Sequence, residues 1–203
     1  MTRFVLATHN AGKKVELQAI LSQVIPSAEV VTAGELGLAD VVEDGLTFVV
    51  EDGLTFEENA LIKARAVAQE TGLPAIADDS GLVVDVLGSA PGILSARWAG
   101  AHGDDRANLE LLLKQLSDIP DRGRGARFVC AAAYVNAGAE VVCTGEMRGT
   151  ILREPVGDGG FGYDPIFQPD GVNVSAAQLS SEEKNAISHR GNALRKLAKQ
   201  IAQ

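Results

Sequence analysis

The sequence is short of aromatic residues, has no excess of basic residues and contains no long apolar segment. Aromatic residues make up 4% of the 203 residues, and 18 Lys and Arg face 27 Asp and Glu, for a net charge of −9. Surfaces that bind nucleic acid or anionic lipid need basic charge, and single-stranded nucleic acid also needs aromatic platforms, so neither partner is expected. No window reaches the roughly 18 apolar residues of a membrane helix, and the N-terminal apolar stretch is too short for a signal peptide. We therefore expect a cytoplasmic protein that holds any phosphate ligand with a few local cations.

Cysteine is also scarce. Cys130 and Cys143 are the only two, they form no C-x-x-C pair, and they fall on two predicted strands of one hairpin. A disulfide between them and a pair of reduced core thiols are both open, and the second is favoured in a cytosolic protein. Two cysteines and three scattered histidines argue against a zinc site. Length and apolar content (46%) suit a single globular domain over residues 1–203.

An acidic pair stands at the centre of the chain. Pro74–Val84 reads P-A-I-A-D-D-S-G-L-V-V, which predicts a strand that ends in a tight turn at Asp78-Asp79 before a second apolar segment. Buried carboxylates are costly unless they are paired or bind a metal, so the pair indicates a Mg²⁺-type oxygen site. An acidic β-turn explains the same residues, and the segment alone leaves both interpretations open.

The N-terminal segment has the pattern of a phosphate loop. Arg3–Ala7 predicts a short strand, and an amphipathic helix follows with apolar residues at Leu17, Ile20, Leu21 and Val24. Thr8–Lys13, T-H-N-A-G-K, therefore joins a strand to a helix N-terminus, where free N–H groups and the helix dipole favour phosphate. Lys13 and Lys14 add charge. The Walker spacing is absent, and capping residues beside solvated lysines would look similar.

An octapeptide is repeated in tandem. Val41–Phe48 reads V-V-E-D-G-L-T-F, and Val49–Phe56 is identical. The period is far below the 20 or so residues of a solenoid repeat, so a local duplication is indicated, with one copy accommodated as extra loop or extended strand. The second copy leads into a helix that has a predicted capping box at Thr55 and Glu58 and ends at Gly72.

Further along the chain, Asp104 is expected to cap a helix that carries a stripe of leucines. Arg127–Asn136 and Glu140–Met147 alternate as a β-hairpin that turns at Ala137-Gly138. A further strand is expected over Gly149–Arg153.

A glycine-rich segment follows, G-D-G-G-F-G-Y-D-P over Gly157–Pro165. It matches G-x-G-x-x-G formally, but Pro165 and the residues after it exclude the helix that a dinucleotide fingerprint must open. The glycines let the backbone approach a ligand closely, and Phe161 and Tyr163 suit a flat base. A plain glycine-rich loop is the alternative, and an NAD(P)-dependent oxidoreductase has little support.

The C-terminal part begins with a predicted capping box at Ser180 and Glu183. On an unbroken helix Lys184 and His189 would lie about 140° apart. Together with Arg190 they can converge on one ligand only if the helix breaks near Ser188; otherwise they form a solvated face.

In order, these segments closely resemble the inosine/xanthosine triphosphate pyrophosphatase family, also called Ham1-like, and the resemblance covers nearly the whole chain. The matching motifs are T-H-N-A-G-K (Thr8–Lys13), G-L-T-F-x-E-N-A with K-A-R (Gly53–Arg65), A-D-D-S-G-L (Ala77–Leu82), P-G-x-x-S-A-R (Pro91–Arg97), G-G-F-G-Y-D-P-I-F (Gly159–Phe167) and E-K-N-A-I-S-H-R-G (Glu183–Gly191). The tandem octapeptide departs from the family pattern, which has one copy.

The resemblance implies a Ham1/Maf-like α/β fold with a long mixed, twisted sheet flanked by helices, and two lobes around a central cleft. It implies a homodimer that cleanses the nucleotide pool by Mg²⁺-dependent hydrolysis of ITP, dITP and XTP to the monophosphate and pyrophosphate. A purine-nucleotide binding protein of the same fold without activity is the alternative.

The resemblance also implies residue roles. Asp79 resembles the general base and, with Glu51, a Mg²⁺ ligand; Glu43 duplicates Glu51 in the first octapeptide. Lys63 and Arg97 would add charge for the triphosphate. His189 and Arg190 would present donors to the 6-oxo group of hypoxanthine or xanthine, which adenine lacks. The implied substrate-binding residues are Thr8, His9, Asn10, Ala11, Gly12, Lys13, Ser80, Phe161, Gly162, Tyr163, Asp164, Lys184, His189 and Arg190.

Overall fold

The computed structural model describes residues 2–8, 10–38, 41–42, 45–46 and 51–202. His9 and, in the tandem octapeptides, residues 43–44 and 47–50 lie outside the described residues, so Glu43 does as well. The helices are α1 (Ala11–Ser22), α2 (Phe56–Thr71), α3 (Asp105–Gln115), α4 (Ser181–Ile187) and α5 (His189–Ile201). The strands are β1 (Thr2–Leu6), β2 (Ala28–Thr32), β3 (Val41–Val42), β4 (Gly45–Leu46), β5 (Ala75–Val84), β6 (Gly125–Asn136), β7 (Ala139–Ile151) and β8 (Phe167–Pro169).

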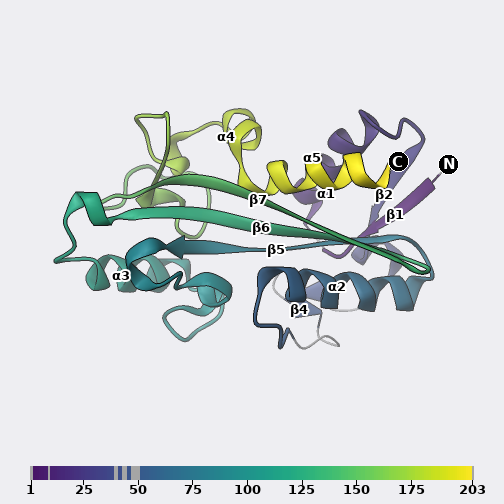
Figure 1. Cartoon of the computed structure of the whole chain (residues 1–203), viewed down its shortest axis with the longest axis horizontal. Coiled ribbons are helices and arrows are strands. Elements are labelled where there is room, and N and C mark those ends of the chain that lie inside the picture. Colours follow the sequence, from purple (N-terminus) through teal and green to yellow (C-terminus); the bar gives the residue numbers. More distant parts are fainter. Residues whose placement is uncertain (1, 9, 39–40, 43–44, 47–50, 203) are drawn as a thin grey trace. The chain divides into compact units, whose positions relative to one another are not determined.

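Six of these strands form one sheet in the order β2-β1-β5-β6-β7-β8. Strand β1 pairs in parallel with β2 and with β5, whereas β7 pairs antiparallel with β8. The sheet is therefore mixed, and helices flank it (Figure 1). The expected α/β fold class is confirmed.

The chain divides into two compact units. The first unit comprises Met1–Asp79, Cys130–Gly145 and Arg190–Gln203, and the second comprises Ser80–Val129 and Glu146–His189. Strands β5, β6 and β7 contribute residues to both. That residues 1–203 act as one domain stays a prediction.

In the first unit, helices cover both faces of the sheet. Alternate residues of β1 point to opposite faces, so Phe4 and Leu6 join one core cluster and Val5 joins another. Helices α1 and α5 pack on the first cluster, and α2 packs on the second through Val67 (Figure 1). Both cysteines are buried and free, so the expectation of reduced thiols is confirmed.

In the second unit, the leucine stripe of α3 packs on the sheet as expected. Leu109, Leu112 and Leu116 are buried against Leu82 and Val84 of β5. Asp104 caps the helix, because its side chain accepts a hydrogen bond from the backbone N–H of Ala107.

The predicted turn at Asp78-Asp79 is wrong. Strand β5 runs without interruption from Ala75 to Val84, through both aspartates, Ser80 and Gly81. The sequence pattern suggested a turn because Asp, Ser and Gly are common turn residues. In the fold, cations from distant segments satisfy the carboxylates, so the strand does not need to end there.

Two smaller expectations need correction. Gly149–Arg153 is not a separate strand, because β7 continues to Ile151 and pairs with β8. Thr55 caps α2 by accepting from the N–H of Glu58, but Glu58 accepts from the N–H of Leu54 instead of completing a capping box with Thr55. The β6–β7 hairpin, the end of α2 at Gly72 and the capping box of Ser180 and Glu183 are confirmed.

The helix break near Ser188 is also present. Helix α4 ends at Ile187, Ser188 has an extended backbone (φ −61°, ψ 145°), and α5 begins at His189. Within the described residues, no helix is both long enough and apolar enough to cross a membrane.

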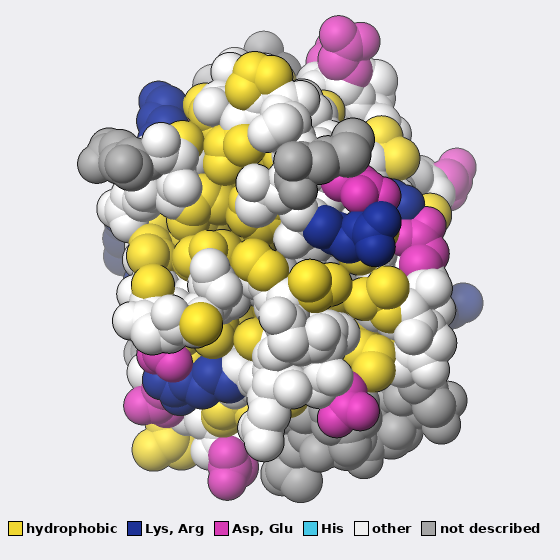
Figure 2. Space-filling view, turned by 90° about the vertical axis from the view of Figure 1, so that its right-hand side faces the viewer, with side chains coloured by type: hydrophobic (Ala, Val, Ile, Leu, Met, Phe, Trp, Pro, Cys, Tyr) yellow, Lys and Arg dark blue, Asp and Glu magenta, His cyan; other side chains and the backbone are white. Residues whose placement is uncertain are grey.

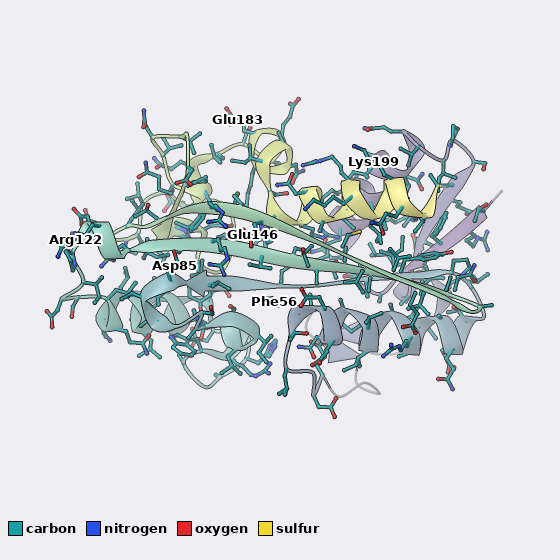
Figure 3. All side chains as sticks on the ribbon, viewed as in Figure 1. Phe56, Asp85, Arg122, Glu146, Glu183 and Lys199 are labelled. Atoms are coloured by element: carbon teal, nitrogen blue, oxygen red, sulfur yellow. The ribbon has the colours of Figure 1, made fainter. Side chains whose placement is uncertain are left out.

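Several surface charges form ion pairs with nearby residues. Figure 2 shows Lys and Arg side chains next to Asp and Glu side chains among apolar ones. Figure 3 labels Asp85 and Glu146, which both form ion pairs with Arg127, at Nη1–Oδ1 2.7 Å and Nε–Oε1 3.4 Å. A groove of about 510 Å³ between the C-terminal half of α2 and the β6–β7 turn contains none of the predicted site residues.

Candidate active site

Two carboxylates of the first unit meet at one buried ammonium group. Lys63 projects from α2, and its Nζ lies 3.1 Å from Oδ1 of Asp79 on β5 and 3.5 Å from Oε2 of Glu51, which precedes the helix. The three side chains are between 12% and 16% exposed. The two residues that the sequence analysis assigned to a metal are therefore brought together around a cation.

Asn59 completes the surroundings of Asp79. Its Nδ2 donates a hydrogen bond of 3.3 Å to Oδ2 of Asp79. Asn59 and Lys63 are four residues apart, so they share a face of α2. Asn59 was not predicted as a site residue, although its spacing from Lys63 could have indicated it.

Asp78 faces a second set of cations. Its side chain is 6% exposed, with Lys13 Nζ 3.4 Å from Oδ2 and Arg190 Nε 3.3 Å from Oδ1. Arg190 also donates from Nη1 to Oε2 of Glu16 at 2.9 Å. Adjacent aspartates on β5 thus have separate partners, in agreement with a structural role for Asp78.

The pKa directions match this pairing. Burial would raise the pKa of Asp78, but Arg190, Lys13 and Lys63 outweigh it and hold that pKa well below its usual range. Burial would lower the pKa of Lys63, but Asp79, Glu51 and Asp78 outweigh it and raise that pKa. Lys63 is therefore an ammonium and Asp78 a carboxylate at neutral pH.

The predicted phosphate loop joins β1 to α1 as expected, but several of its polar groups already form hydrogen bonds with one another. The Asn10 side chain caps α1 by accepting from the N–H groups of Gly12 (2.8 Å) and Lys13 (3.2 Å). The buried Thr8 accepts from the N–H of Asn10 with its Oγ1. Lys14 pairs with Glu35 at 2.6 Å and so does not add a free charge to the loop.

In the second unit, the glycine-rich segment holds an exposed aromatic ring. Phe161 is 75% exposed, and Lys184 Nζ lies 4.8 Å from its ring centroid. Asp164 is buried; its Oδ2 accepts from the N–H of Phe161 and forms a short ion pair with Lys184. The N–H of Gly162 donates to Oδ2 of Asp105 at 2.7 Å, a partner that the sequence analysis missed.

Three other predicted residues of the second unit differ in exposure. Ser80 is exposed on β5. Tyr163 is buried and donates its hydroxyl to the carbonyl of Ser95 at 2.8 Å, so its ring is part of the core. His189 stacks on Phe128 with ring centroids 5.0 Å apart.

The donor set suits a hard cation. Asp79 and Glu51 both direct an oxygen at the position of the Lys63 ammonium, so their charges converge on one point. Mg²⁺ is commonly held by one or two carboxylates, with water and phosphate oxygens completing its octahedron. In the described part of the chain no group of three or more His, Cys, Asp or Glu side chains could hold a metal ion.

Comparisons with known proteins identify the family of the chain. The model of the Ham1 family matches residues 4–200. Similar relatives are the dITP/XTP pyrophosphatases of Streptomyces avermitilis (57% identity, 97% of this chain and 96% of the relative) and Nocardia farcinica (55%, 100% and 96%).

Solved structures give the same result. A HAM1 protein from Coxiella burnetii matches with a TM-score of 0.87 and 41% identity over 99% of this chain and 98% of that one. A nucleoside-triphosphatase / dITP/XTP pyrophosphatase from Mycobacterium abscessus matches with a TM-score of 0.79 and 50% identity over 98% and 100%. The chain belongs to the Ham1 family.

Proposed function

We propose that the protein is a nucleoside-triphosphate pyrophosphatase that hydrolyses dITP, ITP and XTP to the monophosphate and pyrophosphate with Mg²⁺. The supporting observation is the convergence of Asp79 and Glu51 on a single cation position, in a chain whose relatives are named dITP/XTP pyrophosphatases. The general name, hydrolase of nucleoside triphosphates, follows from those relatives; the metal and the residue roles are our proposal.

Asp79 acts as the general base. Its carboxylate accepts a proton from the attacking water while Asn59 holds Oδ2. The oxygen of the water bonds to the α-phosphorus, the bond between this phosphorus and the oxygen that bridges the α- and β-phosphates breaks, and pyrophosphate leaves. Mg²⁺, held by Asp79 and Glu51, would offset the charge of the phosphates.

Cations of the first unit bind the phosphates. Lys63 and Lys13 lie close enough to Asp79 and Asp78 to be held in place before substrate arrives. An incoming triphosphate would replace carboxylate oxygens as their partner, and charge-assisted bonds of this kind are strong. Thr8, Asn10, Ala11 and Gly12 shape the loop, and His9 is included on the resemblance alone.

The glycine-rich segment of the second unit binds the purine. Lys184 covers one face of the Phe161 ring, so the base stacks on the other face. Gly162 and Asp164 set the loop conformation, and Tyr163 supports it from the core. Ser80, Lys184, His189 and Arg190 remain predicted substrate contacts.

Pyrophosphate release from dITP, with and without Mg²⁺ and with dATP as control, tests the proposal. We expect release from dITP only with Mg²⁺ and far less from dATP. Nucleotide binding without turnover would favour the non-catalytic alternative. The homodimer and the cytoplasmic location stay predictions.

A further inference from the structure

Asn59 is an unusual residue for its place. It is the fourth residue of α2 and only 2% exposed. Asn is a weak helix former, and a buried amide is costly unless it is hydrogen-bonded. A buried Asn at the start of a helix therefore needs a local reason.

The Asn59 amide determines how the Asp79 carboxylate is held. Nδ2 of Asn59 donates to Oδ2 of Asp79 at 3.3 Å, and Nζ of Lys63 donates to Oδ1 at 3.1 Å. Each oxygen of the carboxylate has its own donor, and both donors come from one face of α2. Two donors on opposite oxygens restrict rotation of the carboxylate.

The other side of the amide faces the segment that carries Glu51. A Cβ atom added to Gly53 would lie 2.5 Å from Oδ1 of Asn59 and 2.8 Å from Cβ of Glu58. The backbone can approach the amide this closely only because residue 53 has no side chain. Oδ1 is buried and has no hydrogen-bond partner among the described residues, so the approach is not explained by a hydrogen bond.

We propose that Asn59 is a positioning residue for both proposed metal ligands. It orients Asp79 directly, and through its contact with Gly53 it holds the segment of Glu51, so that the two carboxylates stay converged. The expected change in kcat rests on the proposed function, whereas the expected change in cation binding can be measured without turnover.

The second unit offers a matched control. Asn108 is also the fourth residue of its helix, α3, and is 1% exposed. Its Oδ1 accepts from the N–H of Ala99 at 2.7 Å, and its Nδ2 donates to the carbonyl of Ala96 at 3.2 Å. Both of these hydrogen bonds are to backbone and neither involves a proposed metal ligand, so loss of Asn108 should lower stability and leave kcat and Mn²⁺ affinity unchanged.

The experiment compares Asn59→Leu with Asn108→Leu, since Leu has a similar size and a higher helix propensity. Three quantities are measured: kcat and KM for dITP, and the affinity of the nucleotide-free protein for Mn²⁺ by electron paramagnetic resonance. For Asn59→Leu we expect kcat and Mn²⁺ affinity each to fall about 10- to 100-fold, the usual effect of removing a side chain that supports metal ligands, with KM nearly unchanged. Asn108→Leu should lower the melting temperature and leave kcat and Mn²⁺ affinity near their wild-type values.

Gly53→Ala provides a second variant that keeps Asn59. The added methyl must displace the amide or the Glu51 segment, so kcat and Mn²⁺ affinity should fall in the same direction.

Four outcomes separate the proposals. The positioning role would be overturned if kcat and Mn²⁺ affinity of Asn59→Leu stayed within about twofold of wild type. It would also be overturned if Asn108→Leu lost as much of both as Asn59→Leu. No hydrolysis by the wild type, together with weaker Mn²⁺ binding in Asn59→Leu, would refute the proposed function and support the positioning role. A wild type that neither binds Mn²⁺ nor hydrolyses dITP would overturn both.

Discussion

Lys63 in the first unit and Arg124 in the second are both largely buried cations, but different kinds of group stabilise their charges. Lys63 faces two carboxylates, which raise its pKa despite burial. Arg124 is 2% exposed and donates to three backbone carbonyls, those of Leu116, Ile151 and Leu152, at 2.7 to 2.8 Å. Burial lowers its pKa, with Arg153 acting in the same direction.

The difference indicates what each region is for. Backbone carbonyls are dipoles held in place by the fold, and they do not accept protons at neutral pH. The hydrogen bonds of Arg124 therefore serve to join the end of a helix to a strand. The carboxylates around Lys63 are charged side chains that can take another cation or accept a proton. At these two positions, the buried charge that is paired with side chains lies in the proposed reactive region, and the one that is paired with backbone lies in the scaffold.

The largest effect is expected from Asp79→Asn. The variant keeps the size of the side chain but removes the proposed base, so kcat should fall about 10²- to 10⁴-fold while nucleotide affinity changes little. Pyrophosphate release and calorimetric titration with a non-hydrolysable dITP analogue measure the two quantities. Normal turnover would show that the reactive region is misassigned.

Replacing each buried cation by Met tests the comparison directly. Lys63→Met leaves Asp79 and Glu51 without their shared counter-ion, and kcat/KM should fall roughly 100-fold. Arg124→Met removes a hydrogen-bond donor from three backbone carbonyls, of which that of Leu116 also accepts from the N–H of Ile119, so the free energy of unfolding should fall by about 3 kcal/mol.

Arg124→Met should also keep kcat/KM within about twofold of wild type at temperatures where it is folded. Denaturant titration and steady-state kinetics of both variants provide the data. If both variants lose activity to the same extent, the division between reactive region and scaffold does not hold.

Glu51 and Glu43 occupy equivalent places in the two octapeptides, and only Glu51 is described beside Lys63. Glu51→Gln should lower kcat/KM by about 10- to 100-fold, because one proposed metal ligand loses its charge. Glu43→Gln should have no effect. Equal losses in the pair would refute the assignment of the second copy as the functional one.

The smallest effect is expected at Tyr163 in the scaffold. Burial, with a contribution from Asp105, raises its pKa, so the folded state keeps the phenol neutral. Its contribution to stability is complete below the unfolded-state pKa of about 10 and is lost as pH rises above that value.

Tyr163→Phe should therefore reduce the loss of unfolding free energy above pH ~10, by up to about 1.4 kcal/mol per pH unit, and should be slightly less stable at neutral pH. Denaturant titrations across this range measure the slope, with Tyr134→Phe at the other tyrosine as control. An unchanged slope in Tyr163→Phe would contradict the prediction.

Much of the candidate site could be predicted from the sequence, because several of its features depend on short-range spacing. The loop before α1 and the cap at Thr55 each involve residues within a few positions of one another, whereas the sequence left a break at Ser188 and a continuous helix both open. The prediction failed at Asp78-Asp79, where the local letters favour a turn and the fold makes a continuous strand. It also missed Asn59 and Glu16, whose partners stand 20 and 174 residues away.

By itself, the sequence determined local elements of this protein: helix caps and the hairpin between β6 and β7. These follow from hydrogen bonds and backbone preferences within one or two turns of chain. Only the tertiary structure decided what the acidic pair does. Lys13 reaches Asp78 across 65 residues and Lys63 reaches Asp79 across 16, and this long-range pairing lets carboxylates remain inside a strand that their local preference would end.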